Sequence, residues 1–307
     1  MDRLELLATF VRTVETGSLT AAAKALRTTQ PTISKRLSTL ESNVGARLLQ
    51  RNTQGVRPTE EGARYYNVAR RVLTELEQAE SSLQSLRKGL RGKLRLNMPV
   101  GIGEMYLTRV AIEFQRLHPD LELEVTLTDR VVDLVEDGVD VAVRGGGVTD
   151  QSVVARPLGY TAYVLAATPA YLKKYGTPKH PEELNRHNYL RYGGGESESL
   201  LTPGGPMTVR VWSKIEFNNS LSLQVAILEG IGIGRCSRWL VDAWLKSGAM
   251  VEVLPGVAPP PIPFHAVYLP SRFVPEKVRA FVEFVAAQMR RIPGWAASAE
   301  EFLRRRE

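Results

Sequence analysis

The stretch Ser18–Glu41, SLTAAAKALRTTQPTISKRLSTLE, decides the fold of the first part of the chain. Its first half repeats apolar residues at helical spacing, and most of them are small: Leu19, Ala22, Ala23 and Leu26. Small side chains let two helices cross closely. The repeat breaks at Arg27-Thr28-Thr29. Thr29 is a good N-cap for a second helix, and Pro31 falls in the first turn of that helix, where a missing N–H costs nothing.

The second helix is predicted to bury one side and to show polar groups on the other. The buried positions are Ile33, Leu37, Leu40 and Val44. The other side carries Gln30, Pro31, Thr32, Ser34, Lys35 and Arg36. Glutamine can pair with adenine, arginine or lysine with guanine or phosphate, and threonine offers a hydroxyl or a methyl group. The two helices therefore predict a helix–turn–helix that reads DNA, against the alternative of a plain three-helix bundle with a solvated polar face.

Segments on both sides complete this unit. Upstream, an apolar face predicts a first helix, made by Leu4, Leu7, Phe10, Val11 and Val14. Downstream, LLQRNTQGVRPTEEG (48–62) reads as a short hairpin that turns at Asn52–Gly55, between Arg51 and Arg57. A basic hairpin beside a recognition helix predicts a winged helix–turn–helix, with the wing on the DNA backbone or in the minor groove. We take the DNA contacts to be Ser18, Thr20, Thr29, Gln30, Pro31, Thr32, Ser34, Lys35, Arg36, Arg51, Asn52, Thr53 and Arg57.

A long helix is predicted to start at Pro58 and Thr59, with acidic residues in its first turn, where the helix dipole favours them. Apolar residues then recur three or four apart and form a seam for a partner helix: Tyr66, Leu73, Leu76, Leu83 and Leu86. Packing against the chain's own body is the alternative. Two heads joined through this seam would read two half-sites of a pseudopalindromic operator. Gly89 and Gly92 would end the helix as a hinge.

Charge is distributed unevenly over the 307 residues. Residues 1–92 hold 15 Lys and Arg against 9 Asp and Glu, whereas the remainder is nearly balanced. A basic N-terminal part joined to a near-neutral body predicts a polyanion partner for the first part only. The single cysteine, Cys236, cannot form an intrachain disulfide, and the sequence shows neither a signal peptide nor an apolar run of membrane-spanning length. We therefore expect a cytoplasmic protein.

From residue 93 onward, strands and helices alternate. The predicted strands are KLRLNMPV (93–100), LELEVTL (121–127), VDVAVRG (139–145) and PFHAVYLP (263–270). The predicted helices are about 104–117, VVDLVEDG (131–138) and EKVRAFVEFVAAQM (276–289). The alternation of strands and helices begins again near residue 162 and near residue 218. This order predicts an α/β fold with a mostly parallel sheet.

These segments together resemble the LysR-type transcriptional regulators. FVRTVETGSLTAAAKAL, TQPTISKRLSTLE, VGARLLQR and VRPTEEG resemble the N-terminal domain of that family over the first 62 residues. PAYLKKYGTPKHPEEL, LEGIGIGRCSRWLVDAWLKSGAMVEVLP and AVYLPSRFVPEKVRAFVEFV are similar to its C-terminal effector domain. The resemblance implies homodimers or homotetramers, with RNA polymerase as a further partner.

The resemblance also implies three parts. These are a winged helix–turn–helix at 1–58, a dimerising linker helix at 59–91, and an effector domain at 92–307 with two lobes, like a type 2 periplasmic binding protein. Lobe I would comprise about 92–162 and 267–292, and lobe II about 163–266, with two crossover strands between them.

In two-lobed α/β folds, ligands bind at the carboxyl ends of the strands, between the lobes. The candidate residues are Pro99, Val100, Gly101, Ile102, Thr128, Arg144, Asn218, Asn219 and Ser220. The last three open a helix whose free N–H groups suit an anion. Many members of the family have Ser or Thr at 100–102, and Val-Gly-Ile here lacks that hydroxyl, which leaves only backbone N–H groups for a carboxylate. Arg144 is either a ligand clamp or a salt-bridge partner.

Other functions have less support. The glycine runs at 145–147, 193–195 and 230–234 lack a nucleotide-binding context, and the four histidines lack metal-ligand spacing. Cys236 lies between Arg235 and Arg238, which would favour a reactive thiolate, but a buried structural cysteine is the preferred interpretation. We expect no catalytic residues, no metal and no cofactor other than an unidentified small-molecule effector. The sequence predicts an effector-controlled, DNA-binding regulator. The alternatives are a small-molecule binding protein with a vestigial head and a two-lobed α/β enzyme.

Overall fold

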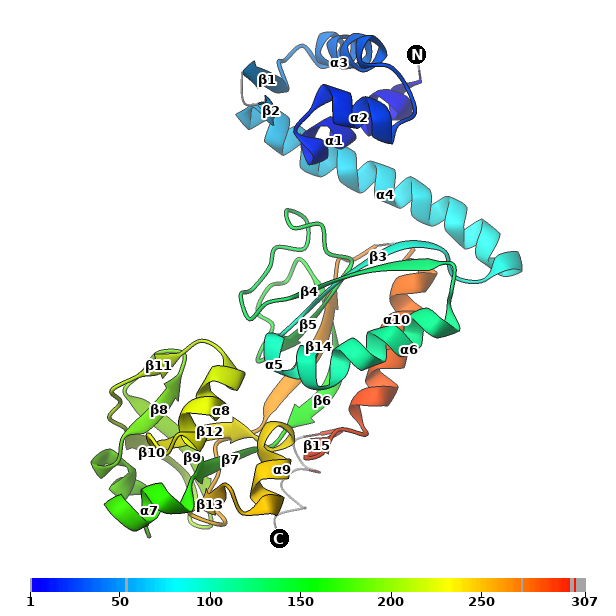
Figure 1. Ribbon diagram of the computed structural model, residues 1–307. Helices are drawn as coiled ribbons and strands as arrows, with labels where there is room; N and C mark the ends of the chain where they lie inside the picture. The colour runs from blue at the N-terminus through cyan, green and yellow to red at the C-terminus, as the bar shows by residue number, and fades with distance from the viewer. Residues whose placement is uncertain (1, 53–54, 272, 299–300, 302–307) are drawn as a thin grey trace. The chain divides into compact units, whose positions relative to one another are not determined.

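The computed structural model describes residues 2–52, 55–271, 273–298 and 301 (Figure 1). For 51–52, 74–75 and 77–88 it describes the backbone alone. The chain forms two compact units. The first comprises Met1–Lys88 with Ser271–Glu276, and the second comprises Gly89–Pro270 with Lys277–Glu307. None of the described helices has the length and apolar character needed to cross a membrane.

The head, residues 1–58, is built from three helices and a hairpin: α1 (Arg3–Thr16), α2 (Leu19–Ala25), α3 (Gln30–Val44), β1 (Leu49–Asn52) and β2 (Gly55–Pro58). Side chains cap the start of each helix, since Asp2, Ser18 and Thr29 accept hydrogen bonds from backbone N–H groups of the first turns. Gly17 and Gly45 end α1 and α3 in the left-handed conformation. The N-cap expected at Thr29 for the helix that reads DNA is thus confirmed.

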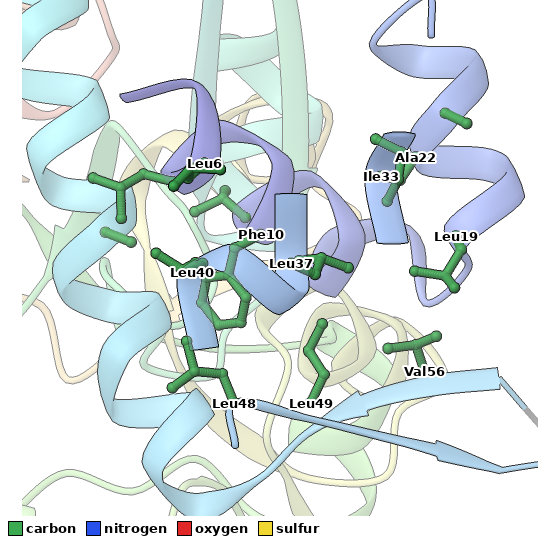
Figure 2. Close-up of a cluster of buried hydrophobic side chains, with 14 residues drawn as sticks. Leu6, Phe10, Leu19, Ala22, Ile33, Leu37, Leu40, Leu48, Leu49 and Val56 are labelled. Atoms are coloured by element: carbon green, nitrogen blue, oxygen red, sulfur yellow. The ribbon is translucent and has the colours of Figure 1, made fainter. Parts of the chain in front are cut away.

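The head has one apolar core, drawn in Figure 2. Its largest fully buried side chains come from α1, α3 and the segment before β1: Leu6, Phe10, Ile33, Leu37, Leu40 and Leu48. The hairpin attaches to the end of α1, because the Val56 N–H donates to the Gly17 carbonyl at 2.9 Å. Gly55 lies against the same carbonyl, where a Cβ would come within 2.8 Å of the oxygen. The position of the wing therefore depends on a close backbone approach that a glycine permits.

The long helix α4 (Glu60–Lys88) packs on this core through its first turns. It begins at Glu60 rather than at Pro58, which is the last residue of β2, and Thr59 caps it by accepting from the Gly62 N–H at 2.9 Å. The ring of Tyr65 lies 5.7 Å from that of Phe10. Tyr66 and Leu73, expected in a seam for a partner helix, pack against the chain's own head core. The side chains of Leu83 and Leu86 lie outside the described residues.

The second unit contains a sheet for each lobe. The lobe I sheet has the order β15-β6-β14-β5-β3-β4. Its strands are β3 (Gly92–Met98), β4 (Leu121–Leu127), β5 (Val141–Gly145), β6 (Val154–Thr161), β14 (Ile262–Tyr268) and β15 (Trp295–Ala296). Strand β3 is parallel to β4 and β5, whereas β14 is antiparallel to β5 and β6. A helical run covers this sheet through α5 (Val100–Ile102), a π-helical turn (Gly103–Leu107) and α6 (Thr108–Leu117), which packs on α10 (Glu276–Met289) through Phe114 and Phe281.

The lobe II sheet has the order β11-β8-β12-β7-β13. Its strands are β7 (Tyr163–Ala167), β8 (Tyr189–Tyr192), β11 (Glu216–Phe217), β12 (Ile233–Ser237) and β13 (Val251–Val253). Its helices are α7 (Pro169–Tyr175), a 3-10 turn (Pro181–Arg186), α8 (Ser220–Leu228) and α9 (Arg238–Ser247). A separate hairpin joins β9 (Ser197–Thr202) to β10 (Gly205–Arg210). The chain crosses between the sheets at Ala162 and again between β13 and β14.

The expectation of a mostly parallel sheet is wrong, because both sheets mix parallel and antiparallel pairs. Three local expectations for the body also differ from the structure. The short helix expected at 131–138 is a turn, because the Asp133 carboxylate accepts from the Val135 and Glu136 N–H groups and holds the chain there. The helix expected from about Glu104 starts at Val100. Strand β14 pairs in lobe I from Ile262 onward, so the return from lobe II precedes the expected boundary at 266, and β15 extends lobe I beyond 292.

Candidate functional site

The exposed face of α3 carries the polar groups that the sequence places there. Gln30, Pro31 and Lys35 are exposed, and Thr32 and Ser34 are partly exposed. The face is fixed because Ile33, Leu37 and Leu40, at helical spacing from one another, point into the head core. Nearby, Thr20 is exposed on α2, while Ser18 and Thr29 serve as N-caps. Of the wing residues, Arg57 is exposed; Thr53 and the side chains of Arg51 and Asn52 lie outside the described residues.

Arg36 departs from this pattern. Its guanidinium forms an ion pair with Glu5 of α1, and its side chain is only 17% exposed. The sequence places this residue among the phosphate contacts, but the structure uses it to hold α3 against α1. The i, i+3 and i, i+4 spacing within α3 could not reveal this pairing, since Glu5 lies 31 positions away in the sequence.

Other cations of the head are exposed and were not singled out from the sequence. They include Lys24 at the end of α2, Arg27 in the turn, and Arg47 before β1. Arg27 adopts a positive φ of 50°, which is uncommon for a residue with a side chain. Within the described part of the chain, no carboxylate lies within 4.0 Å of these groups or of Lys35 and Arg57. The head therefore presents uncompensated positive charge together with the polar face of α3.

The second unit contains a cavity of about 540 Å³ whose wall comes from both sheets. It brings together predicted residues of both lobes: Pro99, Gly101, Ile102, Thr128, Arg144 and Ser220. Parallel strands explain the gathering, because β3, β4 and β5 all end at this edge of the lobe I sheet. Val100, Asn218 and Asn219 do not line the cavity. Tyr163, Tyr192, Arg235 and Trp239, which were not predicted, add an aromatic and basic wall from lobe II.

Asp129 binds one of the backbone N–H groups that the sequence had assigned to an anionic ligand, and it also binds the side-chain amide of Asn219. Its Oδ1 accepts from the Val100 N–H at 3.0 Å, and its Oδ2 accepts from Asn219 Nδ2 at 3.0 Å. Asn219 Oδ1 caps α8 by accepting from the Leu221 and Ser222 N–H groups. Burial raises the pKa of Tyr192 to about 12, and the negative charge of Asp129 contributes. Asp129 was not among the residues predicted for this site. Its place two positions after the end of β4 is the feature of the sequence that could have indicated it.

Arg235 and Arg144, two arginines that line the cavity, have different partners. Arg235 pairs with Glu198 at 3.1 Å, and the Tyr189 hydroxyl donates to the same carboxylate at 2.7 Å. Arg144 donates to the Val132 carbonyl, and its Nε is buried without a partner. Among the described residues, no carboxylate lies within 4.0 Å of Arg144, so the salt-bridge role considered for it is not seen.

Cys236 also lines the cavity but is only 2% exposed. Burial raises the pKa of its thiol to about 12, with the Arg235 charge opposing the rise. The neighbouring Arg238 is engaged by Asp242 and Glu252. The described residues show no cluster of three or more His, Cys, Asp or Glu side chains able to hold a metal ion.

A helix–turn–helix head with exposed cations, followed by a long helix and a two-lobed body with a cavity between its sheets, defines a DNA-binding regulator with a small-molecule binding domain. Comparisons with known proteins agree. Residues 4–63 match the bacterial regulatory helix-turn-helix protein, lysR family, and residues 87–290 match the LysR substrate binding domain.

Individual relatives extend over nearly the whole chain. The uncharacterized HTH-type transcriptional regulator YhjC of Escherichia coli is 33% identical over 303 residues, covering 94% of this chain and 99% of the relative. The full-length structure of AphB, a virulence activator of Vibrio cholerae, is 27% identical with a TM-score of 0.60, covering 93% and 99% of the two chains. CrgA of Neisseria meningitidis is 29% identical with a TM-score of 0.59, covering 94% and 99%.

The chain belongs to the LysR family of transcriptional regulators. The family and fold expected from the sequence are thereby confirmed. The effector domain implies a small-molecule effector, and the head implies DNA as partner.

Proposed function

We propose that α3 enters the major groove of the operator and reads it with Gln30, Thr32 and Ser34, with Pro31 against the adjacent backbone. Lys35 and Arg57 neutralise phosphates, and Lys24, Arg27 and Arg47 add to this charge. The observation that carries the proposal is the exposed polar face of α3 beside cations that have no carboxylate partner among the described residues. Arg36 is assigned to positioning α3 through Glu5, in place of the phosphate contact predicted from the sequence.

We further propose that α4 joins two chains through a seam that differs in part from the predicted one. Val68, Val72 and Leu76 are 46%, 39% and 36% exposed, and they lie four residues apart on one face. This face neighbours the one that Tyr66 and Leu73 use to pack on the head. Leu83 follows Leu76 after seven residues and would continue the seam. A dimer built this way presents two copies of α3 to a pseudopalindromic operator.

The cavity of the body is proposed as the effector site. Arg144 supplies a guanidinium Nε that lacks a partner, and the aromatic side chains of Tyr163, Tyr192 and Trp239 supply apolar surface. Binding there would change the separation of the two sheets and, through the glycines at 89 and 92, the spacing of the two heads. Both glycines have positive φ, 67° and 84°, at the end of α4 and the start of β3.

The experiment that tests this function is a selection of DNA fragments from the source genome with the full chain as bait, at physiological salt. The expected result is enrichment of fragments that share two inverted half-sites, one or more helical turns apart. A wild-type chain that enriches no shared sequence would contradict the proposal and favour a binding protein with a vestigial head. Gln30→Ala is the matched control, since it should reduce selectivity without removing general affinity for DNA.

A further inference from the structure

The carboxylate of Asp129 accepts hydrogen bonds from donors in both lobes. Asp129 follows the end of β4 in lobe I and accepts from the first N–H of α5 in the same lobe. Its other oxygen accepts from Asn219, the N-cap of α8 in lobe II. Pro99, the N-cap residue of α5, makes no side-chain capping bond, so Asp129 performs that role from a different segment.

The two lobes approach closely at this place. A Cβ on Gly101 would clash with Ser220 Oγ at the start of α8 and would lie 3.4 Å from Trp239 Cη2. A side chain at position 101 would therefore have to displace the Ser220 hydroxyl of lobe II. The hydrogen bond between Asp129 and Asn219 lies where lobe I and lobe II already touch.

A carboxylate held by a backbone N–H at a helix start and by a side-chain amide is the arrangement that an anionic ligand group would adopt there. Asp129 belongs to the chain, so it occupies this position without any loss of translational freedom. A second carboxylate would have to displace it and then remain close to its negative charge, which is unfavourable in a partly buried site.

We propose that Asp129 is a specificity-determining residue of the cavity: it fills the position at the start of α5 and excludes ligand carboxylates from it. The effector is then recognised through an anionic or acceptor group at Arg144, whose Nε has no partner, on the wall formed by the end of β5. The hydrogen bond to Asn219 holds the lobes together before an effector binds. This inference rests on the proposed role of the cavity as the effector site.

The test uses the full chain and sodium acetate as the probe, compared with sodium chloride at equal ionic strength. In Asp129→Ala, acetate should occupy the vacated position. Hydrogen exchange should then slow about tenfold or more at the Val100 amide, and the unfolding temperature should rise, both saturably. In the wild-type chain, acetate should leave hydrogen exchange at the Val100 amide unchanged, and any rise in unfolding temperature should come from binding at Arg144. Asp150→Ala is the matched control for the Val100 readout, because Asp150 lines the same cavity and its carboxylate accepts hydrogen bonds from Ser152 and not from Val100.

Asp129→Asn keeps a folded chain available if the alanine variant is unstable. The amide fills the same volume and still accepts from Val100, but its NH₂ group would face that of Asn219. Exchange at the start of α8 should therefore be faster than in the wild type, and acetate should not slow it. The proposal is overturned if acetate protects Val100 equally in the wild type and in Asp129→Ala, or if neither variant differs from the wild type. DNA binding by the same samples is measured separately, so failure of the proposed function is recognised independently.

Discussion

At the scale of single residues, Arg36 and Lys35 are neighbours on α3 with different surroundings. Arg36→Ala removes the ion pair with Glu5, and we expect it to lower the free energy of unfolding by about 1 kcal/mol or less. Lys35→Ala should leave stability unchanged and reduce the slope of log affinity for DNA against log salt by about one. Urea unfolding and anisotropy titrations at several salt concentrations measure the two quantities.

Glu5→Gln is the control for this pair. It removes the same ion pair from the α1 side, so it should destabilise the head as Arg36→Ala does and leave the salt slope unchanged. The slope of log affinity against log salt could instead fall by one unit in Arg36→Ala and stay unchanged in Glu5→Gln. That result would show that Arg36 contacts a phosphate.

Gln30 is an exposed residue in the first turn of α3 and has no structural role among the described contacts. Gln30→Ala should therefore leave unfolding unchanged while reducing discrimination between the operator and single-base variants by about 1–3 kcal/mol at one base pair per half-site. Affinities for the operator and its variants measure this. Uniform weakening across all duplexes would indicate a backbone contact instead.

The thiol of Cys236 is held in its neutral form by burial, which raises its pKa to about 12. A raised pKa leaves little thiolate at pH 8, and only the thiolate reacts with alkylating agents. We expect iodoacetamide to modify the folded chain very slowly at pH 8 and the urea-unfolded chain promptly. Intact mass spectrometry reads the result directly, because the chain has one cysteine. Rapid modification of the folded chain would contradict the buried, neutral thiol.

At the scale of elements, α4 packs on the head by a close backbone contact. A Cβ on Gly62 would clash with the Leu48 carbonyl oxygen, and the Thr59 N–H donates to that same oxygen at 3.0 Å. Gly62→Ala should therefore destabilise the head by about 1–3 kcal/mol, despite the better helix propensity of alanine. Ala63→Ser, on the exposed side of the same turn, should have little effect. Thermal unfolding of both variants provides the comparison, and equal stabilities would contradict the packing.

The apolar face of α4 formed by Val68, Val72 and Leu76 is the element proposed to join two chains. Val72→Asp places a charge in the middle of this face and should shift the protein toward monomers in sedimentation velocity. Arg71→Asp is the matched control, since Arg71 is exposed next to it but outside the seam. If Val72→Asp assembles like the wild type, the seam lies elsewhere on the chain.

Helix faces were predictable from the sequence to different extents. Spacing identified the core side of α3, because Ile33, Leu37 and Leu40 recur within one element. Spacing could not show which apolar face of α4 packs against the head. Tyr66 and Leu73 are seven residues apart, and residues in a seam between two helices have the same separation. That choice depends on where α1 places Phe10 and its neighbours, which is a tertiary contact.

At the scale of the whole molecule, the order of strands and helices predicted the α/β body, and the resemblance to the family implied its two lobes. The carboxyl ends of the strands then indicated the edge where the cavity lies. Pro99, Thr128 and Arg144 meet there because the strands that carry them are parallel neighbours. Most residues of the lobe II wall were not predicted from the sequence, among them Tyr163, Arg235 and Trp239. Which side of their strands and helix faces the cavity depends on how the chain crosses between the two sheets. The bond between Asp129 and Asn219 spans 90 positions and has no signature in local sequence.

The exposed face of α3 is proposed to read a specific DNA sequence. The most direct measurement is fluorescence anisotropy of the full chain with the duplex recovered by genomic selection and with a shuffled duplex, at physiological salt. We expect the affinity for the selected duplex to exceed that for the shuffled duplex by a factor on the order of a thousand or more. Gln30→Ala should reduce the ratio of these two affinities. Equal affinities for the two duplexes, with the same salt dependence, would mean that the head binds charge alone and would contradict the claim.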